Sequence, residues 1–567
     1  MGALMLTGGT ETMLEKRLAE NRFLTSTVPE LFRETCRDRP EKTAIVFEGR
    51  EISYAELQSN ADRCSQALLN LGVRAGDHIA AIPTPSPEFA YSYFGTLQVG
   101  AVVNPLNLLW GSIEYEGILR RNDPKIIITV DDHAGRDYIQ LLRDTLPDLK
   151  SAGEGVSSST VPTLTHLVSV SRGGNKHRDF IDFQDFLAAG EAVDTGAIER
   201  RGGAAKCTDL HSIMQTSGST GLSKSVLLDH RSTLATAHFS AKSVTFAEND
   251  KYINLGPFYH NTGIVALNLA VALAGATLYL IERFDPKQAV ELVDRERITT
   301  TFGFDAHFQA MKRVLDTGRH TFTINKALCA VQPQTYEMIC NEMCRDPQAK
   351  IVQIYAQTEN GPGVSGGEPD CPVYDIMKHT NGRPMPGVEL VIKDITTGEK
   401  LRPNEAGEIC YRSPYLFKGY YKQEEETQKS FDEEGYFHSG DYGTFDNGYV
   451  RFLGRLGDIV KSGGENVSTA YVSSLLMKLF HEDFEDVQTI GIPDPYWGAR
   501  IVSWVRMKPG RATMTLEQLK EQCRGKMAQY EIPKALLPWE GPWPITPIGK
   551  LDRAALENET RKRLSSE

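Results

Sequence analysis

The chain has 567 residues, of which 40% are hydrophobic and 24% charged, and its formal net charge is -12 at neutral pH. This length exceeds what one hydrophobic core normally serves, so we expect at least two domains. The acidic balance argues against a general role on nucleic acid or on an anionic membrane surface. The 9 cysteines include no CxxC pair and do not suggest a disulfide framework.

The chain carries no signal that directs it to a membrane or out of the cell. Its first residues lack a basic segment followed by a continuous apolar run, so no signal peptide is expected and a cytoplasmic location is predicted. The apolar stretch 264–281 contains Asn268 and is split by Gly275. We therefore expect a buried helix, a turn and a buried strand there, and no integral membrane span.

Short β-rich runs alternate with helical segments from residue 28 to about residue 310. They include HIAAIP (78–83), KIIITV (125–130), SIMQTS (212–217) and ATLYLI (276–281). This alternation predicts βα units and parallel sheet, which is an α/β fold. Residues 387–450 change to short strands and turns, and a mixed α+β segment follows residue 454. We predict a large N-terminal domain over 1–456, with a β subdomain at about 387–454, and a small C-terminal domain over 457–567.

The most informative loop is MQTSGSTGLSK at 214–224, which lies between two β-rich runs. Backbone N–H groups and hydroxyls of such a loop can surround phosphate oxygens, and Lys224 adds a cationic donor. The spacing differs from a Walker A loop, and a strand follows instead of a helix. Taken alone, a Ser/Gly-rich loop of this kind is also compatible with a simple flexible turn.

Three further strings downstream carry groups suited to nucleotide chemistry. They are IVQIYAQTENG (351–361), HSGDYGTFDNGYVRFLGRLGDIVKSGGENVS (438–468) and WPITPIGKLDR (543–553). Considered singly, Glu359 could be a solvated surface carboxylate, Asp441 a turn aspartate and Lys550 a tail lysine.

Together the four strings resemble, in order and spacing, the TSGTTGxPK, YGxTE, GD with GRxxD, and PxTxxGK motifs of acyl-adenylate-forming enzymes, in particular their acyl-CoA synthetase branch. The similarity of pattern extends from about residue 28 to residue 553. It implies an ATP-dependent acid–thiol ligase that uses Mg2+ and converts a carboxylic acid through acyl-AMP to acyl-CoA. It also implies that the small α+β C-terminal domain is mobile and rotates between the two half-reactions.

The resemblance assigns roles to individual residues. Lys550, Thr216, Glu359 and His260 become catalytic, with Glu359 and Thr216 holding Mg2+ and His260 beside the acyl carbonyl. ATP and CoA would contact Thr216, Ser217, Gly218, Ser219, Thr220, Gly221, Lys224, Tyr355, Thr358, Asp441, Arg455, Lys461, Gly463 and Gly464. Gly457 stands at the hinge position. A single positioned cation such as Lys550 is typically worth about 3 to 4 kcal/mol in the transition state.

The chain departs from the usual motifs at several positions. Ser223 and Ser225 replace proline and glycine, Ala356 replaces glycine, and the segment 330–332 is bulkier than the usual small residues. In addition, Gly457 stands where Asp or Lys is usual, and Thr469 and Tyr471 replace proline and glutamate. We expect altered loop rigidity and a permissive hinge from these changes, because glycine accepts a wide φ/ψ range.

Other interpretations share some or all of these motifs. The acceptor could be the phosphopantetheine of a separate carrier protein instead of free CoA. A non-catalytic adenylate-binding protein and a membrane uptake protein for fatty acids are further alternatives. Within the ligase interpretation a medium- or long-chain fatty acid ranks first as the substrate, before a short polar acid and an aromatic or alicyclic acid. A homodimer is left open.

Overall fold

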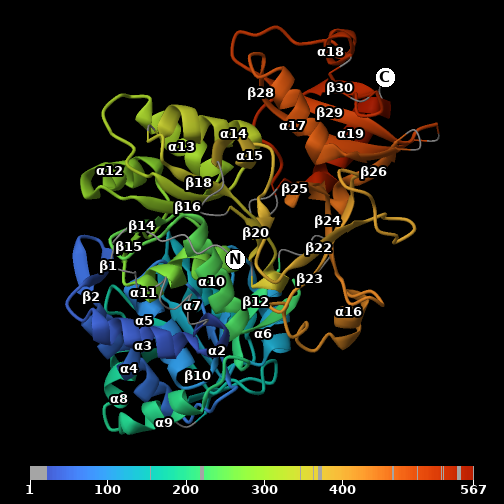
Figure 1. Ribbon diagram of the computed structural model, residues 1–567. Helices are drawn as coiled ribbons and strands as arrows, with labels where there is room; N and C mark the ends of the chain where they lie inside the picture. Colours follow the sequence, from blue (N-terminus) through green and yellow to red (C-terminus); the bar gives the residue numbers. More distant parts are fainter. Residues whose placement is uncertain are drawn as a thin grey trace. The chain divides into compact units, whose positions relative to one another are not determined.

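The computed structural model describes residues 22–565 except 153–154, 217–222, 345, 362, 368–372, 463–464, 495, 525, 528 and 546–550. The chain divides into two compact units (Figure 1). The first unit comprises Met1–Val388 with Ser413–Lys429, and the second comprises Glu389–Arg412 with Ser430–Glu567. The β strands within 389–412 and 430–455 thus group with the C-terminal segment and 413–429 with the first unit, whereas the sequence suggested one β subdomain within the large domain.

Two seven-stranded sheets form the first unit. The first sheet has the order β18-β17-β16-β14-β15-β1-β2, and the second has the order β11-β10-β5-β3-β4-β12-β13. Every neighbouring pair is parallel except the two edge pairs β1/β2 and β12/β13. The predicted α/β class with parallel sheet is therefore confirmed.

The strands of these two sheets have the following bounds. The first sheet contains β1 (Thr43–Phe47), β2 (Arg50–Ser53), β14 (Lys251–Asn254), β15 (Thr277–Leu280), β16 (Thr300–Phe304), β17 (Lys326–Ala330) and β18 (Lys350–Gln353). The second contains β3 (His78–Ala81), β4 (Val102–Pro105), β5 (Ile126–Val130), β10 (His166–Val170), β11 (Ile181–Asp182), β12 (Leu210–Gln215) and β13 (Ser225–Asp229). All five residues of β5 are buried, as expected for a parallel strand covered on both faces.

Shorter strands complete the first unit. A three-stranded sheet contains β19 (Tyr355–Ala356), β20 (Gly363–Gly366) and β21 (Arg383–Pro384). Two small hairpins pair β6 (Asp132–His133) with β7 (Arg136–Asp137) and β8 (Lys150–Ala152) with β9 (Gly155–Ser157).

Helices connect the parallel strands of the first unit (Figure 1). They are α2 (Arg22–Thr25), α3 (Val28–Asp38), α4 (Tyr54–Asn70), α5 (Pro87–Gln98), α6 (Ser112–Asn122), α7 (Tyr138–Thr145), α8 (Phe183–Ala189), α9 (Gly196–Ala204), α10 (His230–Ser243), α11 (Ala270–Ala274), α12 (Pro286–Glu296), α13 (Asp305–Leu315), α14 (Pro333–Met338), α15 (Val373–Met377) and α16 (Glu424–Lys429), with the irregular helices η1 (Thr262–Leu269), η2 (Ile339–Met343) and η3 (Thr358–Asn360). Local chemistry sets their starts: Thr27 caps α3 through the N–H of Glu30, whose side chain completes the capping box.

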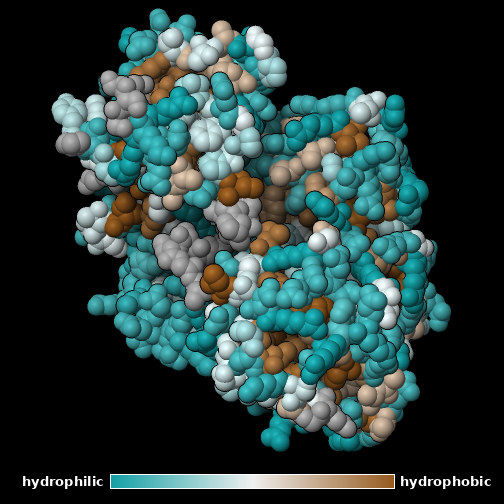
Figure 2. Space-filling view, turned by 180° about the vertical axis from the view of Figure 1, so that it is seen from behind, coloured by the Kyte–Doolittle hydropathy of each residue, from teal (hydrophilic) through white to brown (hydrophobic). Residues whose placement is uncertain are grey.

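The apolar stretch 264–281 lies in the core of the first unit. It forms η1, which is a π-helix, then α11, a left-handed turn at Gly275 with φ of 71°, and the fully buried strand β15. This confirms the predicted helix, turn and strand. None of the helices in the described part of the chain has the length and apolar character needed to cross a membrane. The face drawn in Figure 2 is mostly hydrophilic, and its apolar residues form separate patches.

The second unit contains an antiparallel sheet of β22 (Glu389–Lys393), β23 (Gly407–Arg412), β24 (Phe437–Asp446) and β25 (Tyr449–Arg455). A further sheet has the order β27-β26-β29-β28, with β30 beside β29; its strands are β26 (Ile459–Ser462), β27 (Glu465–Ser468), β28 (Phe484–Asp494), β29 (Gly498–Met507) and β30 (Ala535–Pro538). The turn η4 (Leu456–Asp458) precedes β26, and the helices are α17 (Thr469–Leu479), α18 (Leu516–Cys523) and α19 (Arg553–Ser565). Val472 and Leu476 of α17 share a buried core with Ile501 and Val505 of β29.

Candidate active site

The predicted phosphate loop connects the antiparallel strands β12 and β13, whose last register pair is Gln215 with Ser225. Two hydrogen bonds close its base. The N–H of Thr216 donates to the carbonyl of Lys224 at 3.1 Å, and the N–H of Lys224 donates to Oγ1 of Thr216 at 3.1 Å. The predicted contacts at Ser217, Gly218, Ser219, Thr220 and Gly221 lie outside the described residues.

The two unusual serines strengthen the base of this loop. The Ser223 hydroxyl donates to the carbonyl of Thr216. The buried Ser225 hydroxyl donates to Asn122 Oδ1 at 2.7 Å, and Gln215 Oε1 lies 3.2 Å from the same hydroxyl. Proline and glycine could not make these bonds, so hydrogen bonding here takes the place of the backbone rigidity that proline gives elsewhere.

Lys224 and Glu359 meet at one aromatic residue, Tyr420. The Lys224 ammonium lies 4.5 Å from the centre of the Tyr420 ring, and the Tyr420 hydroxyl donates to Glu359 Oε1 at 2.9 Å. Lys224 also pairs with Glu426 of α16 at 3.2 Å, and this hydrogen bond lowers the pKa of the Glu426 carboxyl. Because solvent screens such an exposed pair, a phosphate oxygen can displace Glu426 from Lys224 at little cost.

The strand and turn around Tyr355 place two more predicted groups. Tyr355 is buried in β19, whereas Thr358 and Glu359 are half-buried in the turn η3. The side-chain amide of Asn261 donates to the carbonyl of Thr358 at 3.4 Å. Its Oδ1 is buried without a hydrogen-bond partner among the described residues, which suits a ligand that donates a hydrogen bond.

His260 lies two residues before the π-helix η1. Its carbonyl accepts hydrogen bonds from the N–H groups of Gly263 at 2.9 Å and Ile264 at 3.0 Å, and its ring packs on Tyr259 with centres 4.8 Å apart. Single π-helical turns occur often at functional sites. His260 is half-buried, and through Asn261 its segment adjoins Thr358.

The bulky segment 330–332 lies where β17 ends. The N–H of Val331 donates to Gln353 Oε1 at 3.2 Å, and the Gln353 amide donates back to the carbonyl of Val331 at 2.8 Å. These reciprocal bonds attach the segment to β18. The N–H of Gln332 donates to Asp305 Oδ1 at 3.0 Å.

In the second unit Asp441 and Arg455 face each other across β24 and β25, where they form a register pair. Arg455 Nε lies 2.9 Å from Asp441 Oδ1. The Asp441 side chain is 2% exposed and the Arg455 side chain 58%, so the carboxylate is fixed within the sheet while the guanidinium remains accessible.

Gly457, the predicted hinge position, is exposed in the turn η4, and a Cβ atom built there would meet no atom of the described residues within 4 Å. Lys461 belongs by its backbone to β26. The predicted sites at Gly463, Gly464 and Lys550 lie outside the described residues. The unusual Thr469 donates its hydroxyl to the carbonyl of Asp458 at 3.0 Å, and the Tyr471 ring lies 5.5 Å from the Arg451 guanidinium.

A Mg2+ ion fits the groups of the first unit. Mg2+ is usually held by one or two carboxylates together with phosphate oxygens and water. Glu359 supplies a half-buried carboxylate that Tyr420 holds in place, and the Thr216 hydroxyl is half-buried at the base of the loop.

Tyr420 and Glu426 were not predicted from the sequence. Both lie in the segment KGYYKQEEE at 418–426, beyond the strings that carried the prediction. A tyrosine and a glutamate in a polar loop carry no chemical pattern of their own. Only their contacts with Lys224 and Glu359 distinguish them.

The two largely parallel sheets, the loop at 216–224 and the second unit together are typical of an adenylate-forming enzyme. A family model described as AMP-binding enzyme matches residues 32–421. The chain therefore belongs to the AMP-binding enzyme family.

Several curated relatives cover nearly the whole chain. The putative acyl-CoA synthetase YngI of Bacillus subtilis is 27% identical over 540 residues, which are 94% of this chain and 97% of the relative. The mitochondrial medium-chain acyl-CoA ligase ACSF2 of Rattus norvegicus is 27% identical and covers 96% and 89%. The 3-[(3aS,4S,7aS)-7a-methyl-1,5-dioxo-octahydro-1H-inden-4-yl]propanoyl:CoA ligase of Rhodococcus jostii is 28% identical and covers 94% and 99%.

Solved structures share the fold. The anthranilate CoA ligase AuaEII in complex with anthranoyl-AMP superposes with a TM-score of 0.80 at 22% identity, covering 96% of this chain and 98% of the other. ATP-bound MatB from Rhodopseudomonas palustris gives a TM-score of 0.76 at 24% identity, covering 94% and 98%. The chain is thus an adenylating enzyme that resembles acyl-CoA synthetases over its length.

Proposed function

We propose that this protein is an ATP-dependent ligase that joins a carboxylic acid to CoA through acyl-AMP. The acid has an apolar acyl group, and a fatty acid ranks first among the candidate substrates. The observation that carries the proposal is the meeting of Lys224 and Glu359 at Tyr420 beside the base of the 216–224 loop. This arrangement brings a phosphate-binding cation and a metal-binding carboxylate to one place. The proposal includes a cytoplasmic location.

In the first half-reaction the carboxylate of the acid attacks the α-phosphate of ATP, and pyrophosphate leaves. Lys224 and the backbone of the 216–224 loop would hold phosphate oxygens, and Lys550 would stabilise the charge that develops on the transferring group. Tyr355 would stack on adenine and Thr358 would contact the α-phosphate. Mg2+, held by Glu359 and Thr216, would neutralise phosphate charge.

In the second unit Asp441 would accept hydrogen bonds from the ribose hydroxyls, and Arg455 would contact ribose or phosphate. Arg455 pairs with Asp441 through Nε, and its side chain is 58% exposed, so its terminal nitrogens can make this contact. In the second half-reaction the CoA thiolate attacks the acyl carbonyl beside His260, and AMP leaves. Lys461, Gly463 and Gly464 would border the pantetheine arm.

An apolar cavity supports the choice of an apolar acid. A cavity of about 60 Å³ lies in the first unit between β1, β15, α4, α5 and the η1–α11 segment. Its wall is formed by Ala44, Ile45, Tyr54, Leu57, Phe89, Ala90, Tyr93, Phe94, Phe258, Ile264, Asn268, Leu269, Val271, Ala272 and Leu278. Tyr54 and Tyr93 satisfy their hydroxyls elsewhere, on the Ala276 carbonyl and on His211. Two of its lining residues, Phe258 and Ile264, flank His260 in the chain.

The proposal is tested by carboxylate-dependent pyrophosphate release from the purified protein with ATP and Mg2+, over a panel of acids, with and without CoA. We expect AMP and acyl-CoA to appear together, with the highest kcat/KM for apolar acids. Acid-dependent release that CoA does not affect would point to a carrier-protein acceptor. Absence of release with every acid would contradict an adenylating function.

Two leucines of one apolar segment test whether the apolar cavity holds the acyl group. Leu269 lines the cavity and Leu273 is equally buried outside the lining set. Each Leu→Ala change should cost about 2 to 5 kcal/mol of stability. Only Leu269→Ala should shift the ratio of kcat/KM values toward bulkier acids, because only it enlarges the cavity. Equal acid preferences in both variants would place the acyl group elsewhere.

A further inference from the structure

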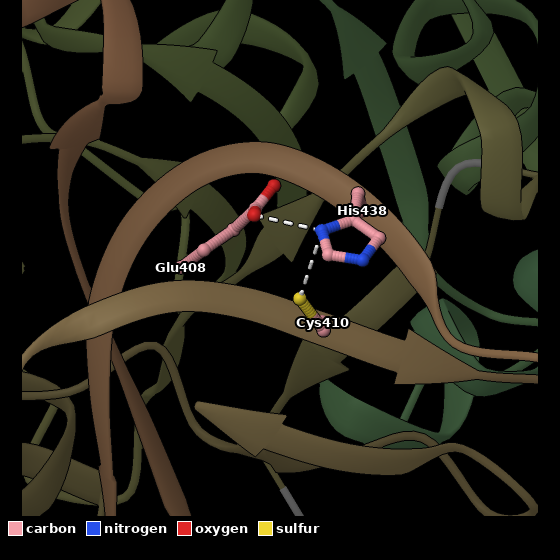
Figure 3. A group of neighbouring side chains, drawn as sticks. All are labelled: Glu408, Cys410 and His438. Carbon is pink, nitrogen blue, oxygen red and sulfur yellow. Dashed lines mark hydrogen bonds and ion pairs between the residues drawn. The ribbon is translucent and has the colours of Figure 1, made fainter. Parts of the chain in front are cut away.

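Three metal-ligating side chains converge in the second unit, apart from the groups assigned above. Glu408 and Cys410 lie on β23, and His438 lies opposite Cys410 on β24. His438 Nδ1 is 2.8 Å from Glu408 Oε2 and 3.6 Å from Cys410 Sγ, and the three ligand atoms all lie within 4.8 Å of one another. Figure 3 shows the three side chains pointing toward a common centre.

The spacing suits a tetrahedral ion of the zinc type. Zn2+ binds Cys sulfur at about 2.3 Å, His nitrogen at about 2.0 Å and carboxylate oxygen at about 2.1 Å, so neighbouring ligand atoms lie roughly 3.3 to 3.6 Å apart. The Sγ to Nδ1 distance of 3.6 Å already satisfies this. The contact between Nδ1 and Oε2 must open by about half an ångström, and Sγ and Oε2, which lie within 4.8 Å of each other, must come to about 3.6 Å.

Groups behind these residues hold them in place. The other ring nitrogen of His438 lies 3.5 Å from Asp432 Oδ2, and Asp432 in turn pairs with the buried Lys393 at 2.6 Å. Glu408 Oε1 accepts a hydrogen bond from the N–H of Gly440 at 3.0 Å. A carboxylate on the second nitrogen of a ligating histidine is the usual supporting arrangement at metal sites.

Charge and access also favour a cation. The Cys410 side chain is buried. A bound metal ion deprotonates such a thiol. One thiolate and one carboxylate then balance the charge of a divalent ion. The His438 side chain is 31% exposed, which gives the ion a route from solvent.

We propose that Glu408, Cys410 and His438 bind a thiophilic divalent cation, with Zn2+ as the best match and water as its fourth ligand. The set is unsuited to Mg2+, which prefers oxygen ligands. The ion would fix His438, three residues before Asp441, and through Glu408 the backbone of Gly440. The ion is therefore a structural element of the segment that carries Asp441.

The test uses the full-length protein, reduced and stripped of metal with a chelator, and titrated with Zn2+ against a chromogenic competitor. We expect about one tight site per chain, weakened about tenfold or more in Cys410→Ala and in His438→Gln. Asp432→Asn, which leaves all three ligands in place, should weaken binding to a similar or smaller degree. Cys207→Ala is the matched control, because Cys207 is a free, partly buried cysteine outside the group.

Titration with Co2+ supplies a second readout. The charge-transfer band between thiolate and Co2+ should appear with the unchanged protein and with Cys207→Ala, and it should be lost in Cys410→Ala. Circular dichroism shows whether each variant is folded. If Cys410→Ala fails to fold, His438→Gln still tests the site, because His438 is partly exposed and its replacement disturbs the packing less. Equal Zn2+ affinity in the unchanged protein and in His438→Gln, or no tight site in the unchanged protein, would overturn the proposal.

Discussion

The structure shows contacts of Tyr420 that the sequence did not predict. The Lys224 ammonium lies over its ring, and its hydroxyl donates a hydrogen bond to Glu359. A hydrogen bond to a charged group is worth about 1.5 to 3 kcal/mol. Under the proposed function, Tyr420 is therefore a positioning residue that holds the carboxylate of Glu359, the proposed Mg2+ ligand, near Lys224.

We predict that Tyr420→Phe lowers the rate of acid-dependent pyrophosphate release by roughly 10- to 100-fold, which corresponds to that hydrogen bond. It should also raise the Mg2+ concentration needed for half-maximal rate, because the carboxylate loses the hydrogen bond from Tyr420. Tyr421→Phe is the matched control, since the neighbouring hydroxyl donates to Asp123 at 3.0 Å instead. An unchanged Mg2+ dependence in Tyr420→Phe would show that Tyr420 does not position Glu359.

At the scale of elements, the predicted hinge is a short turn between two strands. Gly457 lies in η4, which follows β25 and precedes β26. In the described part of the chain, no atom lies within 4 Å of a Cβ atom built at this position. A substitution there consequently tests backbone freedom with little effect from side-chain packing.

We predict that Gly457→Pro keeps acyl-AMP formation but loses most thioester formation, because proline fixes φ near -65° and restricts rotation at the turn. Pyrophosphate release measures the first step, and acyl-CoA formation from preformed acyl-AMP measures the second. Gly457→Ala is the control and should retain both activities. If both steps fall together in Gly457→Pro, the turn is not the hinge.

At the scale of the molecule, the large unit buries two histidines that resist protonation. His230 and His211 are fully enclosed, and burial lowers the pKa of His230 to about 4 and that of His211 well below its ordinary value. His230 Nδ1 accepts the N–H of Val28 at 3.3 Å, which requires the neutral ring. The unfolded chain binds protons at these sites near pH 6.5, while the folded unit does not.

The stability of the large unit should therefore fall as the pH drops from about 6.5 toward 4. The slope should be about 1.4 kcal/mol per pH unit for each histidine. Urea unfolding midpoints at pH 7 and pH 5 measure this effect. His230→Gln should be less stable at pH 7 but should lose less stability between pH 7 and pH 5 than the unchanged protein. Parallel losses in the two proteins would assign the pH dependence to other groups.

The sequence by itself determined the α/β class, the buried helix–turn–strand at 264–281 and the family. These features are encoded locally: runs such as KIIITV and loops such as TSGSTGLSK carry their periodicity and chemistry within a few residues. Which strands pair at long range is a different matter. The tertiary structure decided that Tyr420 meets Glu359, 61 residues away, and that Cys410 faces His438, 28 residues away. Such contacts follow from sheet order and register, which depend on the packing of the whole chain.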